Sequence, residues 1–231
     1  SGLVVASFYT GKSTANNASQ TVETATNRDQ YPLLANRIFI DDPNDPIVNF
    51  SELRNSLTEH INTTSLKGSV YFEYLPTGTS IRIGAERKEV AASLIKLPAA
   101  MSLYKSSELG IVNLDDTITL KEEWLDSAYG ELYKKGAGYQ LTLREATKIM
   151  LTDSDNTALK AVANYMGDTL KPNEGPFQAL DVDYIQNQDL TVSISARSYS
   201  SILKCLYFSC YLSKEDSQEL LTYLSETKYP N

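Results

Sequence analysis

The sequence has few of the residues on which many active sites are built. Its 231 residues include one histidine, His60, and two cysteines, Cys205 and Cys210. A Ser-His-Asp triad or a histidine-based metal site would have to be assembled around His60. The cysteines lie five residues apart in an apolar run typical of a helix, so they would point about 140° apart around its axis. We therefore expect two buried free thiols rather than a disulfide, and the sequence indicates no metal or other cofactor.

Basic residues and long apolar runs are also scarce. The chain carries 21 Lys and Arg against 29 Asp and Glu, a net charge of −8, without basic clusters. This balance argues against a nucleic-acid partner, because phosphate binding requires concentrated positive charge. No stretch of the sequence is long and apolar enough to span a membrane. The segment Leu3-Val4-Val5-Ala6 fits the tail of a removed membrane anchor or signal segment, and equally a loose terminus.

The first part of the chain has little to bury. Residues 11–30 are rich in Ser, Thr, Asn and Ala, a composition that does not offset the entropy lost when a chain becomes ordered. We therefore expect a flexible linker over residues 1–46 and one folded domain over residues 47–231.

Apolar spacing and turn residues predict mainly helices in the folded part. A hairpin is expected over residues 68–83, and a capping box at Thr142-Leu-Arg-Glu145 marks one helix start. Helices are expected over residues 51–63, 93–110, 142–152, 156–167, 196–212 and 214–226. Because an isolated hairpin is only marginally stable, either the fold is essentially helical or the rest of the sheet lies beyond Asn231.

Ser93-Leu-Ile-Lys96 places a hydroxyl and an amine three residues apart at a predicted helix start. Residues at i and i+3 share a helix face, so the lysine nitrogen can reach the serine oxygen. A lysine whose pKa is lowered by burial can act as the base that a weakly nucleophilic serine needs. The same spacing recurs at Ser102/Lys105, a net half turn away, and at Ser201/Lys204, so alone it is also typical of a helix surface.

Ser154-Asp155-Asn156 occupies the polar break between two predicted helices. Ser, Asp and Asn are good helix caps and turn formers, which is sufficient to explain a polar break. Capping does not explain why the break follows a Ser-x-x-Lys pair.

In order and spacing, the two motifs resemble the Ser-x-x-Lys and Ser-Asp-Asn motifs of class A β-lactamases and penicillin-binding proteins. Here they lie 61 residues apart. Thr191-Val-Ser-Ile-Ser-Ala196 also resembles the threonine-rich segment before a late helix of that family. The resemblance covers about residues 50–231. It implies an α/β (α+β) fold of the β-lactamase/transpeptidase type, with a helical subdomain and an antiparallel-sheet subdomain.

The resemblance also implies roles for individual residues. Ser93 would be the acylated nucleophile, Lys96 its proton acceptor, and Ser154 the relay that passes the proton to the leaving nitrogen. Asn156 would bind the amide side chain of the substrate and help to position Lys96. Tyr129 lies where the family has an aromatic wall to its cleft, although it could equally be a tyrosine packed within its loop.

One departure from the family concerns its third motif. The chain contains no Lys-Thr-Gly or Lys-Ser-Gly, and it ends at Lys228-Tyr-Pro-Asn231, just short of where the family has this motif on a strand. We therefore expect a catalytic domain truncated at its C-terminus, with the C-terminal strands missing and an apolar sheet edge exposed.

The other departure concerns deacylation. Class A β-lactamases use a loop glutamate to activate water, but residues 171–190 lack the Glu-x-x-Leu-Asn pattern of that loop. Glu174, Asp181 and Asp183 are the candidates here, and each is more typical of a solvated loop carboxylate. Without a placed base, an acyl-enzyme should turn over slowly.

These observations predict an enzyme that attacks amide bonds through a serine. The first expectation is hydrolysis of the amide bond of small-molecule β-lactams. The alternative is a penicillin-binding D,D-carboxypeptidase or transpeptidase that acts on peptidoglycan stem peptides, and both substrates imply an extracytoplasmic location. A non-catalytic cell-wall-binding relative also stays open. A helical binding module unrelated to the family would place Ser93 and Ser154 far apart.

Overall fold

The computed structural model describes residues 50–64, 68–167, 175–189 and 191–228. The linker expected over residues 1–46 and the Leu3–Ala6 segment lie outside the described residues, as does Glu174. No helix in the described part of the chain is long and apolar enough to cross a membrane.

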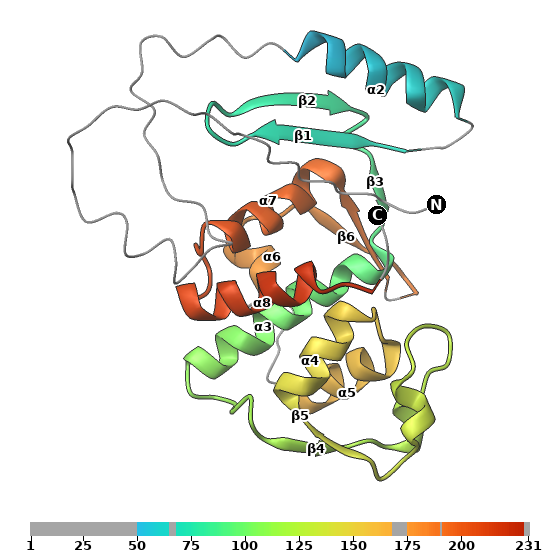
Figure 1. Cartoon of the computed structure of the whole chain (residues 1–231), viewed down its shortest axis with the longest axis vertical. Helices are drawn as coiled ribbons and strands as arrows, with labels where there is room; N and C mark the ends of the chain where they lie inside the picture. Colours follow the sequence, from blue (N-terminus) through green and yellow to red (C-terminus); the bar gives the residue numbers. More distant parts are fainter. Residues whose placement is uncertain (1–49, 65–67, 168–174, 190, 229–231) are drawn as a thin grey trace, which may run out of the picture.

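A long buried helix joins the two ends of the molecule. The helices are α2 (Ser51–Thr63), α3 (Lys96–Glu108), α4 (Leu143–Thr152), α5 (Asn156–Met166), α6 (Pro176–Ala179), α7 (Ala196–Tyr207) and α8 (Lys214–Ser225). Helix α3 runs through the middle, with α4 and α5 on one side and α7 on the other (Figure 1), and α8 packs against α4, α7 and α3. Nine of the thirteen residues of α3 are buried. Helix α3 packs against α4, α5, α6 and α8, and it is therefore the central helix of the core.

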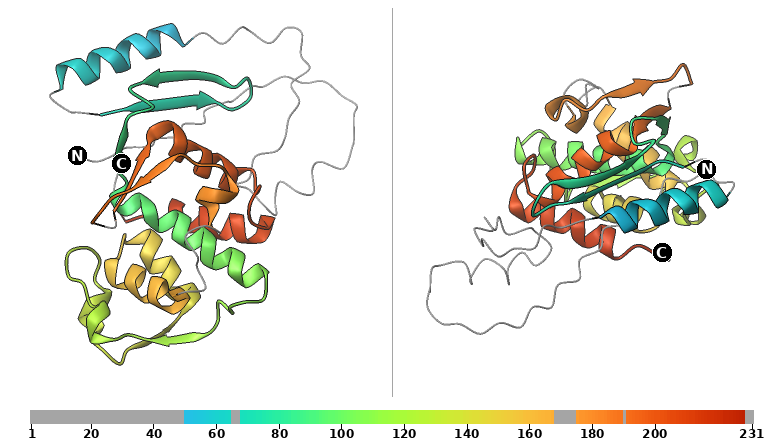
Figure 2. Two further views of the ribbon diagram at one scale, coloured as in Figure 1. Left: turned by 180° about the vertical axis from the view of Figure 1, so that it is seen from behind. Right: turned by 90° about the horizontal axis from the view of Figure 1, so that it is seen from above.

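An antiparallel hairpin and a helix form the end of the molecule farthest from α4 and α5. Strands β1 (Val70–Tyr74) and β2 (Thr79–Ile83) pair with Val70 opposite Ile83. Helix α2 runs alongside this hairpin (Figures 1 and 2), and the ring of Phe50 makes an edge contact with Phe72. The other side of the hairpin meets α7, because Lys204 forms an ion pair with Glu73 at 3.0 Å. The predicted hairpin and first helix are thus confirmed.

The expected capping box starts α4. The Glu145 N–H donates to Thr142 Oγ1 at 3.1 Å, and the Thr142 N–H donates to Glu145 Oε2 at 2.8 Å. The side chain of each residue thereby accepts the backbone N–H of the other. Helix α5 begins after the predicted polar break, where Asp155 accepts the Ala158 N–H at 2.8 Å.

The expectation that only helices follow the first hairpin is wrong. The described part of the chain contains five further strands, namely β3 (Lys88–Val90), β4 (Thr117–Thr119), β5 (Gln140–Thr142), β6 (Tyr184–Gln186) and β7 (Val192–Ser195). They form an antiparallel sheet of order β3-β7-β6 and a separate β4-β5 pair. Strands of three or four residues are too short to show an alternating pattern in the sequence, which is why they were missed.

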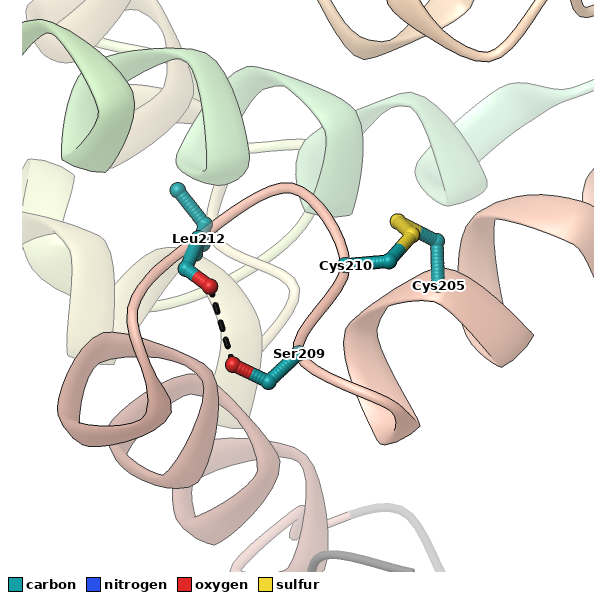
Figure 3. Close-up of a disulfide and its surroundings, with 4 residues drawn as sticks. All are labelled: Cys205, Ser209, Cys210 and Leu212. Carbon is teal, nitrogen blue, oxygen red and sulfur yellow. Dashed lines mark hydrogen bonds between the residues drawn. A yellow bond between two sulfur atoms is a disulfide. The ribbon is translucent and has the colours of Figure 1, made fainter. Parts of the chain in front are cut away.

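The expectation of two free thiols is also wrong, because Cys205 and Cys210 form a disulfide (Figure 3). Helix α7 ends at Tyr207 and does not continue to 212 as predicted. Ser209 has a positive φ of 53°, and the Cys210 N–H donates to the Cys205 carbonyl at 3.0 Å. The chain therefore turns back on itself and brings the two Cα atoms to 5.0 Å. The prediction that the cysteines point about 140° apart assumed one continuous helix. The helix ends between them, so that angle does not apply.

A pair of carboxyl groups connects α3 to α8. Glu108, the last residue of α3, accepts the Ser213 N–H and is paired with Lys105. Asp216, in the first turn of α8, is partly buried, and its burial together with its hydrogen bond to Glu108 raises its pKa to about 6. A carboxyl whose pKa is higher in the folded state stabilises the fold at low pH, and this contribution is lost as the pH rises through about 6.

Asp216→Asn should therefore make the stability of the fold less sensitive to pH. We expect the variant to gain stability relative to the parent protein between pH 5 and pH 8, on the order of 1 kcal/mol after allowance for solvent screening. Thermal unfolding at the two pH values measures the difference. Equal pH dependence of the melting temperature in both proteins would show that the Asp216–Glu108 pair does not carry this effect.

Candidate active site

Ser93 lies on a strained turn between β3 and α3. A 3-10 helix, η1 (Ala92–Ile95), leads directly into α3, and Ala92 before Ser93 has a positive φ of 46°. Such a conformation costs a non-glycine residue on the order of 1–3 kcal/mol and persists where the surroundings enforce it. Here the Ala91 N–H donates to a β7 carbonyl at 2.8 Å, and the buried Tyr199 hydroxyl donates to the Leu94 carbonyl at 3.0 Å. The turn is held from both sides, and Ser93 is exposed.

Lys96 is buried directly behind Ser93 and joins the two sequence motifs. Only 3% of this residue is exposed. Its Nζ lies 3.2 Å from Ser93 Oγ, 2.9 Å from Ser154 Oγ and 2.9 Å from Asn156 Oδ1, and it also contacts the Ser154 backbone carbonyl. Ser154 Oγ donates to Ser93 Oγ at 2.7 Å. The four residues singled out in the two motifs therefore form one connected hydrogen-bond network.

The geometry around Lys96 suits a neutral amine. Four oxygen atoms surround Nζ, and two of them belong to hydroxyls that can also donate to it. A neutral amine can donate to the two carbonyl oxygens, those of Ser154 and Asn156, and direct its lone pair at a serine hydroxyl. Burial lowers the pKa of Lys96 below its ordinary value, and the nearby carboxylates of Asp155 and Asp126 oppose this effect. The arrangement can thus take a proton from Ser93.

The turn that carries Ser154 is anchored by the side chain of Asp155. Ser154 has a positive φ of 51°, and Asp155 is fully buried. Besides capping α5, the Asp155 carboxylate accepts the Leu132 N–H at 2.9 Å and so binds the 126–132 loop to the helix. A Cβ atom on Gly130 would lie 1.9 Å from Asp155 Oδ2, so this contact requires glycine. Sequence reasoning missed this role, because a buried acceptor is not visible in the sequence.

Tyr129 lies on the same loop and is exposed. The Asn156 N–H donates to the Tyr129 carbonyl at 3.1 Å, so the backbone of the loop is bonded to the start of α5. The Tyr129 residue is 59% exposed. This exposure is inconsistent with a tyrosine packed within its loop.

The other Ser-x-x-Lys pairs are used elsewhere. The buried Ser102 hydroxyl donates back to the Pro98 carbonyl at 2.9 Å, and Lys105 is paired with Glu108. Lys204 is paired with Glu73. A fourth pair with this spacing, Ser225/Lys228, is also engaged elsewhere, because Ser225 donates to the Thr222 carbonyl and Lys228 is paired with Asp153. Of the four pairs, only Ser93/Lys96 joins a hydroxyl from the Ser154 turn.

The candidate carboxylates of the late loop lie apart from this network. Asp181 is exposed, and Asp183 forms an ion pair with Lys88 at 2.6 Å. In the described residues, the side-chain hydrogen bonds of Ser93 are those with Lys96 and Ser154, so no carboxylate contacts it. His60 is exposed on α2, and the described part of the chain contains no group of His, Cys, Asp and Glu residues that could hold a metal ion.

Comparison with known proteins bears on the family and the fold. The model of the β-lactamase enzyme family matches residues 52–231. An acyl-enzyme complex of a PBP-A mutant with penicillin G has a TM-score of 0.69 at 24% identity, over 77% of this chain and 70% of that one. A β-lactamase from Sphaerobacter thermophilus has a TM-score of 0.69 at 20% identity, over 79% and 72%. A β-lactamase from Chitinophaga pinensis has a TM-score of 0.68 at 22% identity, over 77% and 70%.

These structures show the fold, and no curated protein sequence matches the chain significantly. The predicted α/β (α+β) fold of the β-lactamase/transpeptidase type is thereby confirmed, with its helical and antiparallel-sheet parts.

The contact between Gly130 and Asp155 can be tested with a matched pair of glycines. Gly130 and Gly138 have nearly the same φ, 86° and 89°, but a Cβ on Gly138 would meet no atom within 4 Å. We expect Gly138→Ala to lower the free energy of unfolding by about 1–2 kcal/mol through backbone strain alone. Gly130→Ala should cost at least about 3 kcal/mol, because Asp155 must also move. Chemical denaturation measures both, and equal losses would contradict a tight Gly130–Asp155 contact.

Proposed function

Because the chain belongs to the β-lactamase enzyme family, we propose that it is a serine hydrolase that cleaves the amide bond of β-lactams through an acyl-enzyme on Ser93. The observation that carries this proposal is the position of Lys96. It is buried, its pKa is lowered, and its Nζ is within hydrogen-bonding reach of both Ser93 and Ser154.

Acylation follows from the hydrogen-bond network. The neutral amine of Lys96 takes the hydroxyl proton of Ser93 while Ser93 Oγ bonds to the carbonyl carbon of the lactam. As the carbon–nitrogen bond breaks, Ser154 gives its hydroxyl proton to the leaving nitrogen and recovers a proton from Lys96. The network ends with Lys96 neutral again and Ser93 esterified, so protons balance and no additional acid is required.

Other groups around the network would bind the substrate. The N–H of Ser93 is in the first turn of η1, where backbone donors are not used by the helix, and it would stabilise the oxyanion. The side-chain amide of Asn156 would bind the amide oxygen of an acylamino side chain. The exposed ring of Tyr129 would form one wall of the binding cleft.

A second candidate function is favoured by the carboxylates. In the described residues, Ser93 is hydrogen-bonded to Lys96 and Ser154 and to no carboxylate, while Glu174, the third candidate base, lies outside them. An acyl-enzyme without a base to activate water would persist. This observation favours a penicillin-binding D,D-carboxypeptidase or transpeptidase that acts on peptidoglycan stem peptides. Either substrate implies that the protein works outside the cytoplasm.

The mass of the intact protein after mixing with benzylpenicillin tests acylation. We expect an adduct on the parent protein that is absent from Ser93→Ala. Ser201→Ala is a matched control, because Ser201 has the same spacing from Lys204, and it should retain the adduct. A lasting adduct supports the penicillin-binding role, whereas loss of the drug with only a transient adduct supports a β-lactamase. A folded protein that shows neither adduct nor loss of drug would instead be a non-catalytic relative.

The role of Lys96 predicts a specific pH dependence. Because its lowered pKa gives the free amine at lower pH, the acylation rate should rise with pH and level off below the ordinary lysine pKa of about 10.4. Lys96→Met and Lys96→Arg should both slow acylation by about 10²–10⁴-fold, since neither side chain can accept the proton. Stopped-flow measurements across this pH range give the rates. A Lys96→Arg protein within tenfold of the parent would exclude lysine as the base.

A further inference from the structure

Asp126 contacts the hydrogen-bond network of Ser93, Lys96, Ser154 and Asn156 at the side-chain nitrogen of Asn156, an atom that takes no part in the proton transfers of acylation. It lies three residues before Tyr129, and its Oδ1 is 3.4 Å from Asn156 Nδ2. The same oxygen accepts the Ala128 N–H at 2.9 Å, and Oδ2 lies 2.8 Å from Lys160 Nζ. Sequence reasoning did not single out this residue, because nothing in its local sequence distinguishes it from other loop carboxylates.

Asp126 is held on one face of α5. Asn156 and Lys160 are four residues apart and therefore adjacent on that face, so the carboxylate bridges one turn of the helix. The backbone N–H of Asp126 also donates to Thr157 Oγ1 at 2.9 Å. The residue is thus fixed to α5 through both its backbone and its side chain.

The side-chain amide of Asn156 can be turned by 180°, which exchanges its oxygen and nitrogen with almost no change in shape. The contact with Lys96 alone does not determine which orientation is adopted. A protonated Lys96 requires the amide oxygen, but a neutral Lys96 could accept a hydrogen bond from the amide nitrogen. A carboxylate can only accept. The hydrogen bond from Lys160 holds the pKa of Asp126 below its usual range, so this carboxylate is ionised at neutral pH. Asp126 therefore selects the orientation with the nitrogen on its side and the oxygen toward Lys96.

We propose that Asp126 is a positioning residue that fixes the amide of Asn156, so that one N–H is bonded to Asp126 and the other is presented to an acylamino oxygen of the substrate. This inference rests on the proposed function and concerns its substrate preference. It predicts that Asp126 matters most for lactams that carry an acylamino side chain, because only these use the Asn156 N–H, whereas the Asn156 oxygen that contacts Lys96 serves every lactam.

Two penicillins with the same ring system test the proposal. Benzylpenicillin carries an acylamino side chain, whereas 6-aminopenicillanic acid has a bare amine at that position. In Asp126→Ala, acylation by benzylpenicillin should fall by about tenfold, the loss expected for one hydrogen bond to a charged group. Acylation by 6-aminopenicillanic acid should fall less, because this substrate loses only the effect of Asp126 on the Asn156–Lys96 contact. The ratio of the two rates is the readout, since general damage to the fold would lower both rates together.

Three further variants make the test specific. Asp126→Asn can direct its amide oxygen at the Ala128 N–H and Asn156, but its nitrogen then faces Lys160, so it should retain part of the preference for benzylpenicillin. Lys160→Met leaves the carboxylate in place and should also retain it. If Asp126→Ala does not fold, Asp126→Ser can replace it, because a serine hydroxyl still reaches the Ala128 N–H but not Asn156 Nδ2.

The outcomes separate this inference from the proposed function. An equal loss with both penicillins, or a loss in Lys160→Met as large as in Asp126→Ala, would overturn the positioning role. A parent protein that neither penicillin acylates would instead contradict the proposed function itself.

Discussion

The burial of Lys96 is the constraint on which the rest of the site depends. A charged ammonium removed from water is costly unless it is paired, and the contacts of Nζ are with two hydroxyls and two carbonyl oxygens rather than with a carboxylate. The two nearby carboxylates, those of Asp155 and Asp126, act at longer range. The acceptors and the two carboxylates favour the charged form, but the cost of burial is larger, so the pKa of Lys96 is lowered and the amine is more readily available as a base.

The strained turns and the packing around the site bring four oxygen atoms into contact with Lys96 Nζ. Ala92 and Ser154 both have positive φ angles, and each lies at or beside a serine of the network. Their turns are held by buried polar side chains, Tyr199 for the first and Asp155 for the second. Helix α3 places Lys96 in the protein core through its row of fully buried residues, which include Ala100, Met101 and Leu103. Strain at the surface of the site is thus supported by rigid packing beneath it.

Part of this organisation could be predicted from the sequence. The capping box at Thr142, the helical spacing in α3 to α5 and the two motifs are local patterns, and the resemblance they carry gave the fold. The short strands could not be predicted, because three residues show no period. The Cys205–Cys210 disulfide depended on where α7 ends, and a helix end without a glycine or proline leaves little signal. The contacts of Asp126 and Asp155 join segments about 25 to 30 residues apart, and only the folded chain brings these together.

The central claim, that Lys96 is a base with a depressed pKa, can be measured directly by NMR titration of protein labelled with ¹³C in its lysine side chains. The account predicts one Cε resonance that titrates below the ordinary lysine value of about 10.4 and that is missing from the spectrum of Lys96→Met. If every lysine resonance, including that of Lys96, titrates near the ordinary value, the lysine is protonated at working pH and the account is wrong.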